Sequence, residues 1–178
     1  MIKNINLNYD FTKLLSADYS AHNGSCITHQ VHELIDIHKQ FGGFPKSFCL
    51  ENTMIHQLWW DNTQIDYQEL GMQLEMEVIT VSSILQSPGC VVPYHRDTFF
   101  QISQRYPDRT ELKVRANIFL EDCKLGQFIQ YVENDIIHTS TNWTAGDGFL
   151  WDSNILHLSA NAGMQNKYTL QISGFLNN

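Results

Sequence analysis

His95 and Asp97, in the stretch VVPYHRDTFF (residues 91–100), are of the residue types that bind metal ions. Residues two apart on a β-strand point to the same face. If residues 91–99 form a strand, both side chains could therefore bind one metal ion, with Arg96 on the other face. A His-x-Asp pair is common by chance, so it predicts a metal site only together with a further ligand.

A third candidate ligand, His157, lies in the later stretch GDGFLWDSNILHLSANAG. A Gly-Asp-Gly turn opens the strand that precedes the strand of His157. Two histidines and one carboxylate on neighbouring strands of a barrel would form the 2-His-1-carboxylate triad, which holds Fe(II) and leaves coordination positions open. The alternative is that each histidine is an ordinary buried side chain.

The last predicted strand, KYTLQISGF, has one apolar and one polar face. The polar residues are Lys167, Thr169, Gln171 and Ser173. The strand KVRANIFL repeats this pattern, with Lys113, Arg115 and Asn117 on its polar face. A buried cation needs a carboxylate from the protein or from a ligand, so these faces could bind an anion. The alternative is a polar sheet face that meets solvent.

These residues must be positioned by a β-rich core. Runs rich in Val, Ile, Thr, Phe and Tyr, separated by turn signals, predict strands over 77–86, 91–99, 112–120, 127–133, 136–140, 148–152, 155–160 and 167–175. Helical spacing predicts helices within 25–43 and 62–76. We therefore expect one mainly β domain over 1–178, with a helical support region at 1–75 and a jelly-roll, cupin-like core at 76–178. An open α+β sandwich is the alternative.

Together these motifs resemble the 2-oxoglutarate/Fe(II)-dependent oxygenases, nearest to small phage-encoded and prolyl- or aspartyl-hydroxylase-like members. The resemblance covers about 78–175. It rests on His95-x-Asp97, on His157 after the Gly-Asp-x-x-x-Trp-Asp turn and strand, and on the cation Lys167 beyond it. It implies a double-stranded β-helix in which His95, Asp97 and His157 bind Fe(II).

The resemblance also implies that 2-oxoglutarate binds as a cosubstrate. Lys167 stands where the family usually has an Arg for the distal carboxylate, and Thr169 matches the hydroxyl residue two places on. Lys makes a point-charge contact where Arg makes a bidentate one, so Arg115 could share or take over this role. Asn117 and Tyr131 complete the expected cosubstrate pocket.

The reaction implied is hydroxylation of an unactivated C–H bond by molecular oxygen, with release of succinate and carbon dioxide. Asp97 excludes the halogenating branch, which lacks this carboxylate. We expect a small-molecule or peptide substrate, such as an amino-acid side chain. The alternatives are a cupin-like metalloenzyme that does not use 2-oxoglutarate and a non-catalytic jelly-roll binding module.

The net charge of −8 and the pI near 5.3 argue against a nucleic-acid partner or an anionic membrane surface. No apolar run approaches the length of about 20 residues of a membrane helix, and the N-terminal residues do not have the apolar stretch of a signal peptide. The four cysteines form no CxxC pair. We expect reduced thiols and a cytoplasmic protein, which for a phage-encoded member means the cytoplasm of the infected cell.

Several other residues have both a functional and a structural interpretation. His29, His32 and His38 share the first predicted helix, but no acid or cysteine completes a metal site there. The pair Trp59-Trp60 either borders a substrate site or belongs to the core. The 105–109 loop, with Arg105 and Arg109, either determines substrate specificity or is a solvated turn. The aromatic residues that could be pocket walls or core are Tyr94, Phe99, Tyr131 and Trp151.

Overall fold

The computed structural model describes residues 1–20, 23–25, 39, 45 and 47–177, with the backbone alone at 23–25. The helix predicted within 25–43, with its three histidines, lies outside the described residues, as does Cys26. The described helices are α1 (Thr12–Leu15), α4 (Leu50–Thr53), α5 (Tyr67–Leu74) and α6 (Phe100–Arg105). Within these parts of the chain, no helix is long and apolar enough to cross a membrane.

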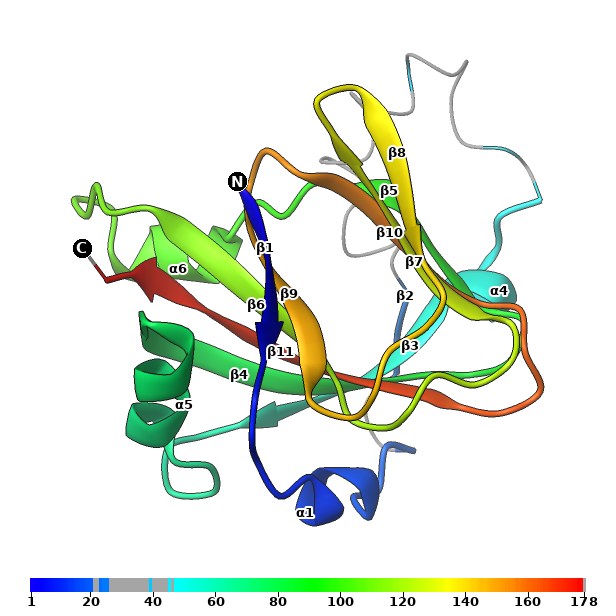
Figure 1. Ribbon diagram of the computed structural model, residues 1–178, viewed down its shortest axis with the longest axis horizontal. Coiled ribbons are helices and arrows are strands. Elements are labelled where there is room, and N and C mark those ends of the chain that lie inside the picture. The colour runs from blue at the N-terminus through cyan, green and yellow to red at the C-terminus, as the bar shows by residue number, and fades with distance from the viewer. Residues whose placement is uncertain (21–22, 26–38, 40–44, 46, 178) are drawn as a thin grey trace.

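Two antiparallel sheets face each other (Figure 1). The strands are β1 (Ile2–Asn6), β2 (Asn23–Ser25), β3 (Met54–Trp60), β4 (Met76–Gln86), β5 (Val91–His95), β6 (Lys113–Phe119), β7 (Gln127–Glu133), β8 (Ile136–Ser140), β9 (Asp147–Asp152), β10 (Leu156–Asn161) and β11 (Lys167–Leu176). The larger sheet has the order β1-β9-β6-β11-β4-β3-β2 and the smaller one β5-β10-β7-β8. From β4 onward the chain passes back and forth between the sheets, which is the double-stranded β-helix, or jelly roll, expected from the sequence.

The predicted strand over 91–99 is wrong in its second half, because β5 ends at His95. Phe99 has a left-handed backbone, with φ of 52°, and α6 begins at the next residue. Phe99 and Ile102 are buried against Phe175, whereas Phe100 is exposed. The apolar residues after Asp97 therefore follow the packing of a helix and not the alternation of a strand.

The expectation that residues 1–75 supply only supporting helices is also wrong. β1 pairs with β9, and β3 pairs with β4, so both strands extend the larger sheet. Alternation along β3 separates the two tryptophans. Trp60 is buried and its Nε1 donates to Ser83 Oγ at 2.8 Å, whereas Trp59 is 52% exposed. One tryptophan is core and the other is a surface residue.

The helix predicted within 62–76 is confirmed as α5. Asp66 caps it by accepting hydrogen bonds from the backbone N–H groups of Gln68 and Glu69. Gly71 is required inside this helix because a Cβ there would lie 2.5 Å from the carbonyl oxygen of Met76, where the chain enters β4. The close approach of backbone to backbone brings α5 onto the outer face of the larger sheet (Figure 1).

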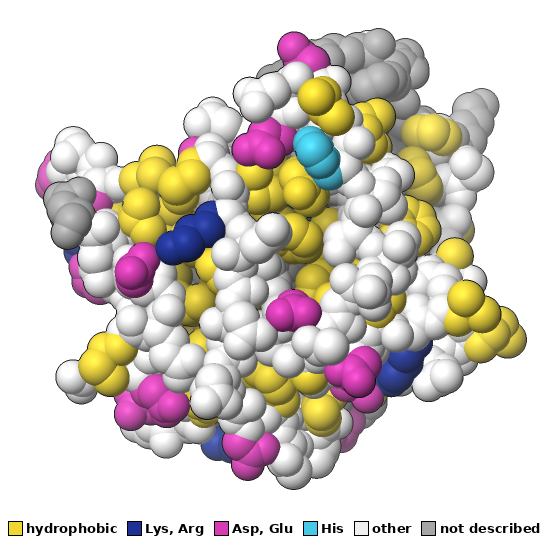
Figure 2. Space-filling model, viewed as in Figure 1, with side chains coloured by type: hydrophobic (Ala, Val, Ile, Leu, Met, Phe, Trp, Pro, Cys, Tyr) yellow, Lys and Arg dark blue, Asp and Glu magenta, His cyan; other side chains and the backbone are white. Residues whose placement is uncertain are grey.

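Two apolar clusters lie on opposite faces of the larger sheet. The outer cluster includes Leu14 and Leu70 from the helices, with Leu170 and Ile172 of β11. The inner cluster, between the sheets, is largely aromatic and contains Phe119, Ile129, Trp143, Phe149, Trp151 and Ile155. In the view of Figure 2, hydrophobic side chains fill the space between the two sheets of Figure 1. Because β11 is apolar toward the helices, its polar residues face the other sheet.

Candidate metal centre

His95, Asp97 and His157 meet between the sheets, as expected. His95 and His157 are direct cross-strand neighbours on β5 and β10, with ring centroids 4.2 Å apart. Asp97 Oδ1 lies 3.9 Å from His95 Nε2, and Asp97 Oδ2 lies 4.0 Å from His157 Nε2. All three residues are buried, and one ligand atom of each lies within 4.8 Å of the others.

Backbone carbonyls orient both imidazoles. His95 Nδ1 bonds the carbonyl oxygen of Pro93 at 2.9 Å, and His157 Nδ1 bonds that of Ile155 at 3.0 Å. A carbonyl can only accept, so each Nδ1 carries the proton, and in a neutral imidazole Nε2 then has a free lone pair. Nε2 is the atom that faces Asp97, and so the imidazoles are held in the tautomer that a metal ion requires.

The charges of the cluster also suit a cation. Burial, reinforced by the neighbouring His95, lowers the pKa of His157 to about 3. Burial alone would raise the pKa of Asp97, but Arg115 and the two histidines outweigh it and lower that pKa to about 2. At neutral pH His157 is therefore neutral and Asp97 ionised, the protonation states in which these groups bind a metal ion.

Donors from the larger sheet fix both oxygens of Asp97. Arg115 Nη1 donates to Oδ1, and Trp151 Nε1 donates to Oδ2 at 2.8 Å. Because Asp97 lies beyond the end of β5, these bonds, rather than strand alternation, direct its carboxylate toward the histidines. Arg96 points elsewhere, since its Nη1 donates to the carbonyl oxygen of Asn154 in the turn between β9 and β10.

The donor set fits a divalent transition metal. Two neutral imidazole nitrogens and one carboxylate on one side of an ion form the facial triad of non-haem Fe(II) sites, and three protein ligands leave other positions open. Within the described residues, this is the one group of three or more His, Cys, Asp or Glu side chains arranged to hold an ion.

Lys167 is a buried cation farther along the same interior. Its Nζ donates to the carbonyl of Phe128 and to Ser159 Oγ, both at 2.9 Å, with a longer contact of 3.5 Å to the carbonyl of Ala160. Burial lowers its pKa to about 7, against a smaller opposing effect of Cys123. No carboxylate among the residues that the structure describes lies within ion-pair distance of this ammonium group.

The spacing between Lys167 and the cluster follows from β10. Ser159, the partner of Lys167, is two residues beyond His157 on this strand. Two residues of a strand span about 7 Å, and their side chains share a face. The ammonium group is thus bonded to a residue about 7 Å along β10 from His157.

Three further predicted residues lie on the same interior. Thr169 is buried on β11, opposite Phe119 of β6. Asn117 is buried on β6, and its Oδ1 has no hydrogen-bond partner among the described residues. Tyr131 is the direct cross-strand neighbour of His157. An orphaned, buried amide oxygen is unusual in a folded protein, and it indicates that a ligand or water completes this interior.

Sequence reasoning missed several residues of this site. The sequence indicates Trp151 only as a pocket wall or a core residue, yet its indole N–H donates to Asp97. Ser159 bonds Lys167, and its position two residues after His157 was the available signal. His138 is not a residue of this site: it stacks on Tyr131, with centroids 5.0 Å apart, and its strand β8 lies on the side of β7 away from His157. Tyr94 is not a wall of this site, because β5 alternation places it opposite to His95 and its hydroxyl donates to Gln130.

The 105–109 loop is tied to the paired ends of strands β4 and β11, in the middle of the larger sheet. Arg109 forms ion pairs of 2.8 Å with Glu77 and Glu111, and its guanidinium lies 3.8 Å from the ring centroid of Phe175. These contacts describe a loop anchored to β4 and β11. Its part in specificity stays a prediction.

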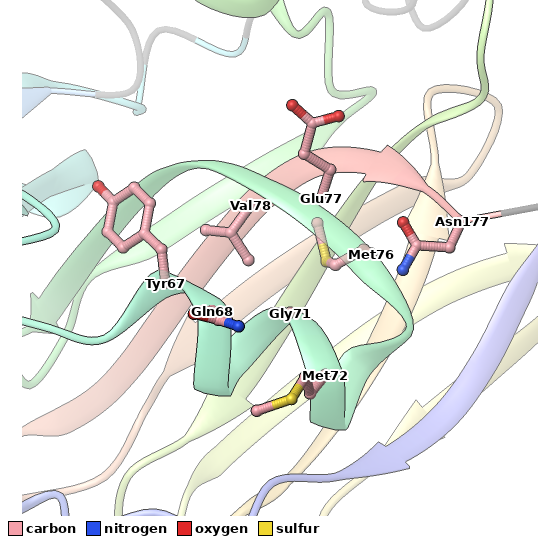
Figure 3. Close-up of a pocket in the computed structure, with 8 residues that line it drawn as sticks. All are labelled: Tyr67, Gln68, Gly71, Met72, Met76, Glu77, Val78 and Asn177. Carbon is pink, nitrogen blue, oxygen red and sulfur yellow. The ribbon is translucent and has the colours of Figure 1, made fainter.

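A surface cleft of about 380 Å³ lies between α5 and the start of β4, and Figure 3 shows the residues that line it. Its lining residues are Tyr67, Gln68, Gly71, Met72, Met76, Glu77, Val78 and Asn177. No member of the His95, Asp97 and His157 cluster lines it, so this cleft is separate from the candidate metal centre.

No protein-family model matches the sequence, and no curated protein matches it. Solved structures match in fold. A prolyl-4-hydroxylase from Pseudomonas putida is 17% identical, with 70% of this chain and 73% of that chain covered and a TM-score of 0.50. The non-heme alpha-ketoglutarate-dependent epimerase SnoN from nogalamycin biosynthesis is 12% identical, with 68% of this chain and 63% of that chain covered and a TM-score of 0.51. The expected resemblance is thereby confirmed at the level of the fold.

Proposed function

We propose that this protein is an Fe(II)- and 2-oxoglutarate-dependent oxygenase that hydroxylates an unactivated C–H bond. The observation that carries the proposal is the buried cluster of His95, His157 and Asp97, with the Nε2 atoms of both imidazoles facing an ionised carboxylate. The fold shared with a prolyl-4-hydroxylase supports this chemistry by analogy alone.

In this proposal His95, Asp97 and His157 hold the iron. Bound Fe(II) and 2-oxoglutarate supply the oxidising chemistry, in which one atom of O₂ enters succinate as carbon dioxide leaves and the other enters the hydroxylated product. The protein holds the ligands rigid through Pro93, Ile155 and the donors on Asp97. The aromatic cluster between the sheets excludes water from the reacting groups.

We assign the distal carboxylate of 2-oxoglutarate to Lys167. A buried ammonium group is costly unless an anion accompanies it, and a carboxylate from the ligand would meet this need. The separation of two strand residues, about 7 Å, between His157 and the partner of Lys167 suits a short dicarboxylate that spans the metal and the ammonium group. Thr169 and Asn117 would bond the ligand, and Tyr131 would line its path near the metal. We do not assign Arg115 to this carboxylate, because it already bonds Asp97.

A metalloenzyme that does not use 2-oxoglutarate is the second candidate. It is favoured by the contacts of Lys167, whose ammonium group already has Phe128 O, Ser159 Oγ and, at longer distance, Ala160 O as acceptors. A lysine with these acceptors could be purely structural. The two candidates differ in whether 2-oxoglutarate binds, and the binding-module alternative differs from both because it needs no metal.

The substrate we propose is a small molecule or peptide, such as an amino-acid side chain. The acidic charge of the chain supports this proposal over a nucleic-acid substrate. Among the residues that the structure describes, Cys49, Cys90 and Cys123 have free thiols. The cytoplasmic location itself stays a prediction.

Anaerobic reconstitution with Fe(II) and 2-oxoglutarate tests the proposal. The expected result is a weak visible charge-transfer band that is absent from His95→Ala and Asp97→Ala. His138→Ala is the matched control, because it removes a histidine from the same sheet face outside the cluster, and it should keep the band. If the metal binds but 2-oxoglutarate gives neither the band nor a heat of binding on titration, the second candidate is supported. If the wild type binds no metal, the binding module is supported.

A further inference from the structure

Two neighbouring residues of the larger sheet, Arg115 and Trp151, hold the carboxylate of Asp97, and a third, Ser173, anchors Arg115. Arg115 on β6 is the direct cross-strand neighbour of Ser173 on β11 and of Trp151 on β9. Arg115 Nη1 and Trp151 Nε1 each donate to one oxygen of Asp97, and Arg115 Nε donates to Ser173 Oγ at 2.9 Å. The larger sheet therefore presents a row of residues, two of them donors to Asp97, to the side on which the smaller sheet carries the histidines.

This row matters because Asp97 has no strand to orient it. β5 ends at His95, and Phe99, two residues after Asp97, has a left-handed backbone. The face of Phe99 also lies 5.5 Å from the guanidinium carbon of Arg115. The side chain of Asp97 is 2% exposed and that of Arg115 is 20% exposed, so their ion pair is largely shielded from water. Removal of Arg115 would free the carboxylate to rotate away from the two histidines.

We propose that Arg115 is a positioning residue of the metal centre: anchored by Ser173, it fixes the orientation of Asp97 toward His95 and His157. This inference rests on the proposed function, since it concerns how the same site holds its metal. It assigns Arg115 to the carboxylate ligand and leaves the cosubstrate to Lys167.

Two effects of Arg115 on metal binding oppose each other. Its positive charge repels a divalent cation and weakens the donor strength of Asp97, so removal of the charge alone would tighten binding. Its orientation of the carboxylate favours binding, and loss of such an outer partner typically costs 10- to 100-fold in metal affinity. Asp97 lies outside the strand and depends on its hydrogen-bond donors for its orientation. We therefore expect the loss of orientation to outweigh the loss of the repelling charge.

The test is the affinity for Co(II), measured anaerobically from its visible absorption without 2-oxoglutarate. Arg115→Met should weaken binding by about 10- to 100-fold, and Ser173→Ala, which keeps the charge but frees Nε, by a smaller factor. Lys113→Met is the matched control. It removes a cation two residues away on the same strand, whose Nζ bonds Ser103 and not Asp97, and it should bind like the wild type.

Affinities of both Arg115→Met and Ser173→Ala equal to or tighter than that of the wild type overturn the inference. If Arg115→Met fails to fold by circular dichroism, Ser173→Ala decides alone. A second measurement, 2-oxoglutarate affinity at saturating Co(II), should be unchanged in Ser173→Ala, and a loss there larger than the loss of Co(II) affinity would assign Arg115 to the cosubstrate instead. A wild type that binds no Co(II) removes the proposed function together with the inference, whereas unchanged variants alone remove only the inference.

Discussion

Trp151 Nε1 donates a hydrogen bond of 2.8 Å to Asp97 Oδ2, and the ring of the same tryptophan lies 4.3 Å from that of His157. Trp151 is fully buried in the aromatic cluster between the sheets. One side chain thus links the apolar core to two members of the candidate metal centre. Packing of the core and geometry of the site are therefore coupled.

Trp151→Phe keeps an aromatic ring but removes this donor. A buried, ionised carboxylate that loses a hydrogen bond should cost about 1–3 kcal/mol in the free energy of unfolding. Urea denaturation measures this loss. In an Asp97→Ala background, the same substitution should cost less, because the carboxylate is absent. Equal costs in the two backgrounds would show that only ring volume matters.

The affinity for 2-oxoglutarate should depend on pH through Lys167. Burial lowers the pKa of this lysine from 10.5 to about 7 in the free protein, and a carboxylate partner favours its charged form. The affinity should therefore be constant below pH 7 and fall by about tenfold per pH unit above it. Calorimetry with Co(II)-loaded protein measures the dissociation constant, and proton uptake on binding at pH 8 provides an independent check.

Lys167→Arg is the control for this pH dependence. Arginine stays protonated throughout the range, so any binding that remains should lose the fall above pH 7. A wild-type affinity that does not change between pH 6 and 9 would contradict the assignment of the distal carboxylate to Lys167.

The two neighbouring tryptophans of β3 should respond differently to the same substitution. Trp60→Phe removes a buried hydrogen bond to Ser83 and leaves space in the outer cluster, which should cost about 1–3 kcal/mol. Trp59→Phe changes an exposed residue and should stay within about 0.5 kcal/mol of the wild type. Thermal and urea unfolding measure both. Similar losses for the two variants would contradict the assignment of β3.

Gly71→Ala tests the contact between α5 and β4. Alanine is favoured over glycine in a helix by about 1 kcal/mol, but its Cβ would lie 2.5 Å from the carbonyl oxygen of Met76. We expect the clash to outweigh the helix preference, with a net loss of about 1–3 kcal/mol in unfolding free energy. The exposed residue Gln68 of the same helix is the control, and Gln68→Ala should be nearly neutral. A Gly71→Ala protein as stable as the wild type would rule out this close approach.

The sequence alone predicted the strands of the core and the three residues of the candidate centre, although the strand invoked for Asp97 ends at His95. Alternation and turn residues predict all eight strands from β4 to β11, seven of them to within a residue or two, because side-chain direction along a strand and chain reversal are local properties. The same alternation places Lys167, Thr169 and Ser173 on one face. His95 and His157 could be selected since both lie on strands whose inner face is predictable.

Only the tertiary structure decided how the remaining residues take part. The N-terminal strands join the larger sheet through pairing with β9 and β4, and such long-range partners leave little signal in short segments. Asp97 reaches the histidines from outside β5 because Arg115 and Trp151 hold it there, a contact between residues far apart in the sequence. Alternation says which face a side chain occupies but not which charge it meets across the barrel, and so the role of Arg115 could not be inferred before the two sheets were placed against each other.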